Sequence, residues 1–391
     1  MAPMEPLSLY LHIPFCRHRC SYCDFNTYTT VTELQDAYVS ALARELKQVA
    51  DGASLAGQLR PGHTVFFGGG TPSLLSVGQV SRLLDVLETA FGLVPEAEIT
   101  MEANPETVDA PYLCAVRAAG INRLSYGMQS ANNNELQLLG RTHGMDAVLH
   151  AVEDARAAGI ENINLDLIYG LPDQDVASWN KSLQEALALQ PPHLSLYCLT
   201  IEPGTPLRRR LHNGEILAPD PDVAATQYEV ACDLLSAAGY EHYEISNWAK
   251  PGFQCRHNLA YWRDQEYLGL GAGAHGKAAG KRYQTVRQPR VYIRRMMEGE
   301  SGGYPLSAAA AEWHDLDVAE EMSDRAITQL RLLQEGLDLA AFEAQFGQSF
   351  DEAFDEAAKL EQWRLLERDG SRLLLTRDGW FVSNQVFYRF V

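Results

Sequence analysis

Short apolar runs alternate with amphipathic segments along the first half of the chain. The runs predict strands at Ser8–Ile13, Thr64–Phe67, Glu98–Glu102, Arg123–Tyr126, Asn164–Tyr169 and His193–Leu199. Between them, apolar residues recur at helical spacing and predict helices at Gln35–Val49, Val77–Phe91, Pro111–Ala119, Met145–Ala158 and Ser178–Leu189. This order predicts parallel strands with helices outside. Six units are fewer than a closed barrel needs, so we predict an α/β fold, an open partial (β/α)6 barrel that is TIM-like.

The pattern changes after Leu199. A connector rich in Pro and Gly, Ile201–Leu207, leads to a helical stretch at Asp222–Ala238 and a strand-like stretch at Tyr240–Trp248. A loop rich in aromatic residues and histidine follows. We expect residues 1–240 to form the barrel core and residues 241–310 to form a connecting β and loop region.

The last part of the chain has a different pattern. Helical periodicity extends from about Ala319 to Arg368, and the alternating residues from Leu373 predict a small hairpin. Helices that end in such a ribbon resemble a winged-helix module. We therefore predict a smaller α+β, winged-helix-like C-terminal domain over residues 311–391. It carries no excess of Lys or Arg, so packing or docking is favoured over DNA binding.

Composition and charge narrow the possible partners. Hydrophobic residues make up 46% of the 391 residues and charged residues 21%, as in ordinary globular chains. The formal net charge of −19 opposes binding to nucleic acid or to an anionic membrane. The chain start lacks the features of a signal peptide, and no apolar run is long enough to span a membrane. We expect membrane contact only through a partner.

Three of the seven cysteines lie together, at Cys16, Cys20 and Cys23, with the spacing C-x3-C-x2-C. The other four are scattered, and the odd count favours metal ligation in a reducing cytoplasm over a disulfide framework. Thiolates are the usual ligands of iron–sulfur clusters. Three of them leave one iron of a 4Fe–4S cluster open. A zinc loop and reactive thiols are the alternatives.

This spacing, followed by an aromatic residue, resembles the radical S-adenosylmethionine (SAM) superfamily. The resemblance implies that the open iron takes the amino and carboxylate groups of SAM. Gly68-Gly69-Gly70-Thr71-Pro72 ends the second predicted strand. Alone it is equally typical of a tight turn, but here it is similar to the Gly-Gly-Thr-Pro segment of that superfamily, whose carbonyl accepts from the SAM ammonium group.

Polar side chains stand near the ends of three further strands: Glu102, Gln129 and Asp166. A buried acid or amide in a strand costs several kcal/mol unless it has a partner. Ribose hydroxyls are suitable donors, and neighbouring backbone or an arginine is the alternative. Arg141 is a candidate clamp for a carboxylate, with a surface arginine as its alternative.

Together these segments resemble the oxygen-independent coproporphyrinogen III oxidase family. The resemblance rests on residues 8–16, the cysteine loop, residues 66–72 and 102–105, Arg141 and residues 166–172. It implies that SAM is contacted by Tyr10, Tyr22, Gly69, Gly70, Thr71, Glu102, Gln129, Arg141, Asp166 and, with less support, Thr200.

Two departures count against decarboxylation of coproporphyrinogen. The oxidase pattern resembles C-x3-C-x2-C-x-C, whereas the last position here is Phe25. The oxidases also carry an N-terminal extension, and little precedes Ser8 here.

A third feature is the run His257-Asn-Leu-Ala-Tyr261-Trp262. Imidazole can ligate heme iron, and aromatic rings stack on porphyrins. A histidine beside Tyr and Trp is also often a packed, hydrogen-bonded core group. Cys255 is either a thiolate ligand or a small buried residue. His275 either shapes the SAM site or satisfies backbone groups. The motif is similar to that of the heme chaperone branch of the oxidase family, where it has been tied to heme.

The resemblance therefore implies a heme chaperone with a 4Fe–4S cluster, SAM and heme. It would deliver heme to acceptor hemoproteins such as respiratory enzymes, and it is a possible homodimer. The alternatives are a radical SAM enzyme that acts on a porphyrin, either the oxidase or a heme-modifying enzyme, and a cluster-bearing interaction module.

Overall fold

Six parallel strands form the middle of a twelve-stranded sheet in the computed structural model, which describes residues 6–391. They follow the chain in spatial order: β1 (Leu7–Ile13), β2 (Gly62–Gly69), β3 (Leu93–Ala103), β4 (Arg123–Gln129), β5 (Asn162–Tyr169) and β6 (His193–Cys198). Each neighbouring pair is parallel, with a register shift in the pairs β1–β2, β2–β3 and β4–β5. The strands are strongly apolar, as expected where both faces are covered. All six predicted strands are present.

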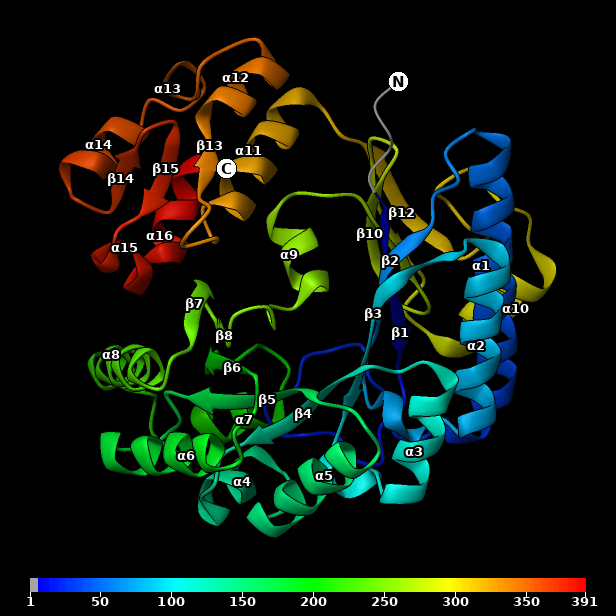
Figure 1. Cartoon of the computed structure of the whole chain (residues 1–391), viewed down its shortest axis with the longest axis horizontal. Coiled ribbons are helices and arrows are strands. Elements are labelled where there is room, and N and C mark those ends of the chain that lie inside the picture. Colours follow the sequence, from blue (N-terminus) through cyan, green and yellow to red (C-terminus); the bar gives the residue numbers. More distant parts are fainter. Residues whose placement is uncertain (1–5) are drawn as a thin grey trace.

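Helices cover the outside of these strands (Figure 1). They are α1 (Gln35–Leu55), α2 (Val77–Ala90), α3 (Ala110–Ala119), α4 (Asn133–Leu139), α5 (Met145–Ala157) and α6 (Val176–Ala188), with short 3-10 turns at Thr32–Leu34, Pro72–Leu74 and Pro105–Thr107. The start of α2 is fixed by a capping box, in which Ser76 and Gln79 satisfy each other's backbone N–H groups. Its buried side chains, among them Leu83 and Leu87, face the sheet.

The sheet grows at both edges with later segments of the chain. After α7 (Pro206–His212) and α8 (Pro221–Ala237), β7 (Glu241–Glu244) and β8 (Asn247–Ala249) pair antiparallel beyond β6. The predicted single strand Tyr240–Trp248 is wrong in this respect, because the chain turns back at Ile245 and Ser246.

On the other edge, four strands follow α9 (Arg256–Trp262) and extend the sheet beyond β1. These are β9 (Tyr267–Leu270), β10 (His275–Ala278), β11 (Lys281–Thr285) and, after α10 (Pro289–Glu298), β12 (Ala310–Asp315). β9 runs parallel to β1, and the other three are antiparallel. β12 and β7 are the ends of the strand order, so the barrel is open, as predicted.

The C-terminal part has a hydrophobic core of its own, which includes Leu330, Phe342, Leu373 and Phe390. It contains the helices α11 (Val318–Gln329), α12 (Leu339–Phe346), α13 (Phe350–Ala353), α14 (Ala357–Gln362), α15 (Arg377–Phe381) and α16 (Ser383–Phe387), a 3-10 turn at Tyr388–Phe390, and the antiparallel strands β13 (Leu337–Asp338), β14 (Leu366–Asp369) and β15 (Arg372–Leu375). This agrees with the predicted smaller α+β domain, but the hairpin is β14–β15, and the chain after Leu375 is helical rather than extended.

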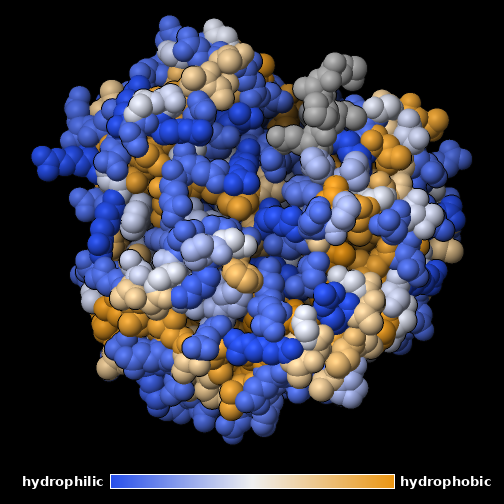
Figure 2. Space-filling model, in the orientation of Figure 1, coloured by the Kyte–Doolittle hydropathy of each residue, from blue (hydrophilic) through white to orange (hydrophobic). Residues whose placement is uncertain are grey.

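Hydrophilic residues dominate the face seen in Figure 2, with smaller apolar areas between them. This is the expected surface of a chain with 51 acidic and 32 basic side chains. None of the helices within residues 6–391 has the length and hydropathy needed to span a bilayer. The first five residues, on which part of the signal-peptide prediction rests, lie outside the described residues.

Candidate SAM and iron–sulfur cluster site

The loop that follows β1 carries Cys16, Cys20 and Cys23. Backbone hydrogen bonds close its base, because Tyr28 N donates to Pro14 O at 2.7 Å and Cys16 N donates to Tyr28 O at 3.0 Å. Its middle is tied to α4 through Ser21, whose hydroxyl donates to Leu138 O at 2.6 Å. The loop is therefore closed at its base and tied to the barrel at its middle.

The three thiols are free and line one cavity. Two of them accept hydrogen bonds: Thr71 Oγ1 donates to Cys16 Sγ at 3.6 Å, and Arg141 Nη1 donates to Cys20 Sγ at 3.4 Å. Burial raises the pKa of Cys16 to about 11, so ligation of this thiol to iron would require the loss of its proton.

An iron–sulfur cluster and a single metal ion require different distances between the ligating thiols. Among the described residues, no three His, Cys, Asp or Glu side chains converge as ligands of one ion would. A cubane instead binds each thiolate at a different iron, so its cysteines stand farther apart. The soft donor set and the adjoining cavity fit such a cluster.

The glycine segment at the end of β2 packs directly on the cysteine loop. Gly70 N donates to Ile13 O and Thr71 N donates to Phe15 O, both at 2.8 Å. A Cβ on Gly70 would lie 2.6 Å from Phe15 O, so only glycine allows this approach. Gly69 has a φ of 112° and donates from its N–H to Glu102 Oε2 at 3.0 Å.

Glu102 and Asp166 face the same cavity from β3 and β5. Burial, followed by the repulsion of Asp166, raises the pKa of Glu102 to about 7. Asp166 Oδ2 accepts from Ser125 Oγ at 3.0 Å and Oδ1 accepts from Asn164 Nδ2 at 2.8 Å. Burial still raises its pKa. The two acids thus form a polar floor of the cavity, where burial makes the charged carboxylates unfavourable without a ligand.

Gln129 and Arg141 flank this floor. Gln129 ends β4 with a φ of 65°, a conformation that costs a non-glycine residue free energy and that occurs often at functional sites. Arg141 Nη2 donates to Asn104 Oδ1 at 2.8 Å and to Gly127 O at 2.6 Å. Its buried Nε has no partner among the described residues. Arg141 is therefore an anchored cation whose Nε–H has no partner within residues 6–391, not a surface arginine.

The cavity has a volume of about 530 Å³ and gathers residues from all six parallel strands or the loops after them. Tyr10, Tyr22 and Thr200 line it, together with the cysteines, the glycine segment, the two acids, Gln129 and Arg141. His257 and Tyr261 also reach its wall. Trp262 does not line it and instead faces a neighbouring cavity.

Comparison with known proteins identifies the family of the chain. Residues 10–186 match the model of the Radical SAM superfamily, and residues 316–382 match that of the HemN C-terminal domain. Heme chaperone HemW of Mycobacterium tuberculosis is 39% identical over 99% of this chain and 95% of its own length. The chain belongs to the HemW family. Heme chaperone HemW of Escherichia coli is 44% identical over 75% of this chain and 77% of that protein.

A solved structure extends the similarity to the whole fold. Coproporphyrinogen III oxidase (HemN) from Escherichia coli, described as a radical SAM enzyme, superposes with a TM-score of 0.84 and 26% identity. The match covers 99% of this chain and 90% of that one. The partial barrel and the C-terminal region of this HemW-family chain therefore share one architecture with that oxidase.

The His257 motif lies on α9, between the sheet and the C-terminal part (Figure 1). His257 Nδ1 lies 2.7 Å from Thr64 Oγ1 and Nε2 lies 2.8 Å from Tyr261 Oη. The ring stacks on Phe66 with centroids 5.1 Å apart. Burial lowers the pKa of His257 to about 3. In this HemW-family chain, then, His257 is a neutral, packed side chain, and its predicted role as an iron ligand stays a prediction.

The sequence patterns missed several residues of the cavity. Ser125, Asn164, Ser195, Arg123 and Tyr197 line it from within the strands, and Asn104 lines it from just after β3. The same signal that identified Asp166, a polar side chain in an apolar strand, is present for Ser125 and Asn164. Arg123 is almost fully buried and stands at the start of β4, where nothing in the local pattern separates it from a surface arginine.

Proposed function

We propose that this protein is a heme chaperone that holds a 4Fe–4S cluster and SAM, binds heme and passes it to an acceptor hemoprotein. The observation that carries the proposal is one cavity that combines the three loop cysteines with polar groups from the strand ends. The relatives that share most of the chain's length are heme chaperones by name.

Cys16, Cys20 and Cys23 are the proposed cluster ligands. When bound, the cluster supplies an open iron position for SAM. Gly69, Gly70 and Thr71 fix the loop against β2 and let the ligand approach the backbone. The remaining proposed SAM contacts surround this point: Tyr10, Tyr22, Glu102, Gln129, Arg141, Asp166 and Thr200.

These contacts have separate tasks. Glu102 and Asp166 accept from hydroxyl and ammonium donors, Arg141 offers its free Nε–H to a carboxylate, and the tyrosine rings exclude water. The cavity volume of about 530 Å³ is in the usual range of small-molecule sites.

Heme is proposed to bind near His257, Tyr261 and Trp262. Direct ligation by His257 requires that one of its two hydrogen bonds break. The acceptor is proposed to be a hemoprotein such as a respiratory enzyme, met in the cytoplasm by a monomer or homodimer, with membrane contact only through that partner. We also propose the domain division at residues 240 and 310, with the C-terminal region as the docking part.

One observation favours a second function, a radical SAM enzyme that acts on a porphyrin. The chain superposes over 99% of its length on a coproporphyrinogen III oxidase. Phe25, which is 63% exposed and stands where the oxidase pattern has its last cysteine, argues against that reaction.

Anaerobic reconstitution followed by three measurements tests these functions. The chaperone proposal expects iron and sulfide for one cubane, stoichiometric heme binding, and heme transfer to an apo-hemoprotein. Cys16→Ser, Cys20→Ser and Cys23→Ser should each lose the cluster, whereas Cys114→Ser, on the exposed side of α3, should keep it. Carbon dioxide release from coproporphyrinogen without heme transfer would replace the chaperone by the enzyme.

A further inference from the structure

A second cavity lies beside the first, with a volume of about 570 Å³. The two share part of their walls, including Tyr10, Gly69, Glu102 and Tyr261. Further aromatic side chains from Phe25, Trp262 and Tyr267 line the second cavity. Flat apolar walls next to a polar site suit a planar ligand of considerable size.

The floor of this cavity is one face of the β10–β11 hairpin. His275 pairs with Gln284 and Lys277 pairs with Arg282, and all four line the cavity. The residues between them, Gly276 and Tyr283, are buried on the opposite face. The two-residue period of the strands therefore aims an imidazole and two cations at the same space.

His275 is available for a ligand, in contrast to His257. No group within residues 6–391 is hydrogen-bonded to the His275 ring, which is exposed. Partial burial and the nearby Arg282 and Arg287 lower its pKa, so the neutral form that ligates metals is present at neutral pH.

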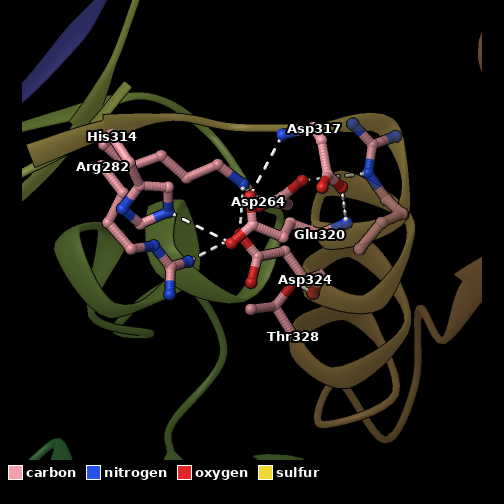
Figure 3. A network of polar contacts seen from close by, with 9 residues as sticks. Asp264, Arg282, His314, Asp317, Glu320, Asp324 and Thr328 are labelled. Atoms are coloured by element: carbon pink, nitrogen blue, oxygen red, sulfur yellow. Dashed lines mark hydrogen bonds and ion pairs between the residues drawn. The ribbon is translucent and has the colours of Figure 1, made fainter. Parts of the chain in front are cut away.

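The cations of the cavity are unequally engaged. Lys277 is paired with Asp264 and Asp324, and Arg282 Nη2 donates to Asp324 Oδ2 at 2.6 Å. Figure 3 shows this network, in which Asp324 on α11 faces Arg282 on the hairpin. The guanidinium of Arg287 makes no ion pair among the described residues and is exposed. Arg287 and the exposed side of Arg282 remain for an anionic ligand.

We infer that this cavity is the heme site, with the His275 imidazole as an iron ligand and with Arg287 and Arg282 facing the propionates. The inference rests on the heme-chaperone function proposed above and names its site. The motif on α9 then has a role other than ligation of iron. Tyr261 and Trp262 form a wall of this cavity, and His257 fixes Tyr261 through the 2.8 Å hydrogen bond. Heme would then lie next to the SAM cavity, with Tyr10 and Tyr261 between them.

Titration with two porphyrins, one with iron and one without, distinguishes the role of the iron ligand from that of the anion-binding residues. Hemin and metal-free protoporphyrin are titrated into the reconstituted full chain, with absorption and fluorescence as readouts. His275→Ala should weaken hemin about tenfold or more and change its spectrum, and it should leave protoporphyrin unchanged. Arg287→Gln should weaken both porphyrins about tenfold, as expected for a lost charge-assisted hydrogen bond.

His314→Ala is the matched control, because His314 is an exposed histidine on the neighbouring strand β12 that does not line the cavity. Iron content and SAM binding show that each variant is folded. If wild type binds hemin and His275→Ala binds it with the same affinity and spectrum, the inference is wrong and the chaperone function stands. If the reconstituted wild type binds no hemin, the chaperone function itself fails.

Discussion

At the scale of single residues, Glu102 has the most consequential environment in the cavity. Its carboxyl group accepts from Gly69 N–H, and its pKa is raised to about 7 by burial and by Asp166. A cationic ligand favours the charged form of such a group. Its protonation and the binding of SAM should therefore be linked.

We expect the affinity for SAM to rise between about pH 6 and pH 8 and then to level off, because the free carboxyl group titrates near 7. Glu102→Gln should flatten this rise and weaken binding at pH 8 about tenfold, in line with the loss of a charge-assisted hydrogen bond. Equilibrium dialysis of SAM at several pH values measures both effects.

Two comparisons isolate the carboxyl group. The amino group of SAM titrates near pH 8 itself, so the profile of the variant is subtracted from that of wild type. Glu153→Gln removes an exposed carboxylate on α5 and should bind as wild type does. Equal pH profiles for wild type and Glu102→Gln would assign the titration to another group.

At the scale of elements, the end of β2 and the cysteine loop behave as one unit. The backbone of Gly70 contacts that of Ile13 and Phe15, and Thr71 bonds Cys16. The position of the thiols therefore depends on a contact between two backbone segments. Substituting side chains within the cysteine loop would not test this contact.

We expect Gly70→Ala to lower the iron content after reconstitution and to destabilise the protein by about 1–3 kcal/mol, because its Cβ would lie 2.6 Å from Phe15 O and 2.9 Å from Ile13 O. Gly78→Ala is the matched control. It lies on α2 with no atom within 4 Å of the new Cβ and should be neutral or slightly stabilising. Iron analysis and urea unfolding measure the outcome, and a fully loaded, equally stable Gly70→Ala would show that this contact does not hold the loop.

Elements with a clear period were predictable from the sequence, and elements made by distant pairing were not. The six parallel strands read as apolar runs because both of their faces are buried. β9 has four residues, and its pairing with β1 joins Tyr267 to Ser8, a contact that no local pattern contains. The helix α4 has seven residues, too few for a periodic signal.

The candidate site divides in the same way. Strand-end polarity identified Glu102, Gln129 and Asp166 because parallel strands end at one edge. The state of a histidine depends on atoms far along the chain: Thr64 engages His257, whereas the ring of His275 is left open. Spacing alone therefore could not rank the two as ligands.

At the scale of the whole molecule, the C-terminal part contacts the rest of the chain through ion pairs, some of them buried and others exposed. Arg331, after α11, pairs with Glu244 at the end of β7 and lies 4.3 Å from the ring centre of Trp262. Arg377, on α15, pairs with Asp233 on α8. The first contact joins three parts of the structure, including a wall of the proposed heme cavity.

Arg331→Ala should destabilise the full chain by about 3 kcal/mol at neutral pH, because Glu244 is completely buried and, without its ion pair, must either stay charged or take up a proton. Arg377→Ala breaks a pair whose side chains are more than half exposed and should cost at most about 1 kcal/mol. Urea unfolding of both variants compares a buried with an exposed contact at the same junction.

The pH dependence provides the decisive check. Burial raises the pKa of Glu244, and Arg331 opposes that rise. Without Arg331 the pKa rises further, so the folded variant binds a proton that the unfolded chain has already lost, and its stability falls as pH increases above about 4.5. The deficit of Arg331→Ala should therefore be larger at pH 8 than at pH 5. A deficit that does not change with pH, or one that Glu244→Gln fails to reduce in the double variant, would mean that the lost packing on Trp262, not the buried carboxylate, accounts for the destabilisation.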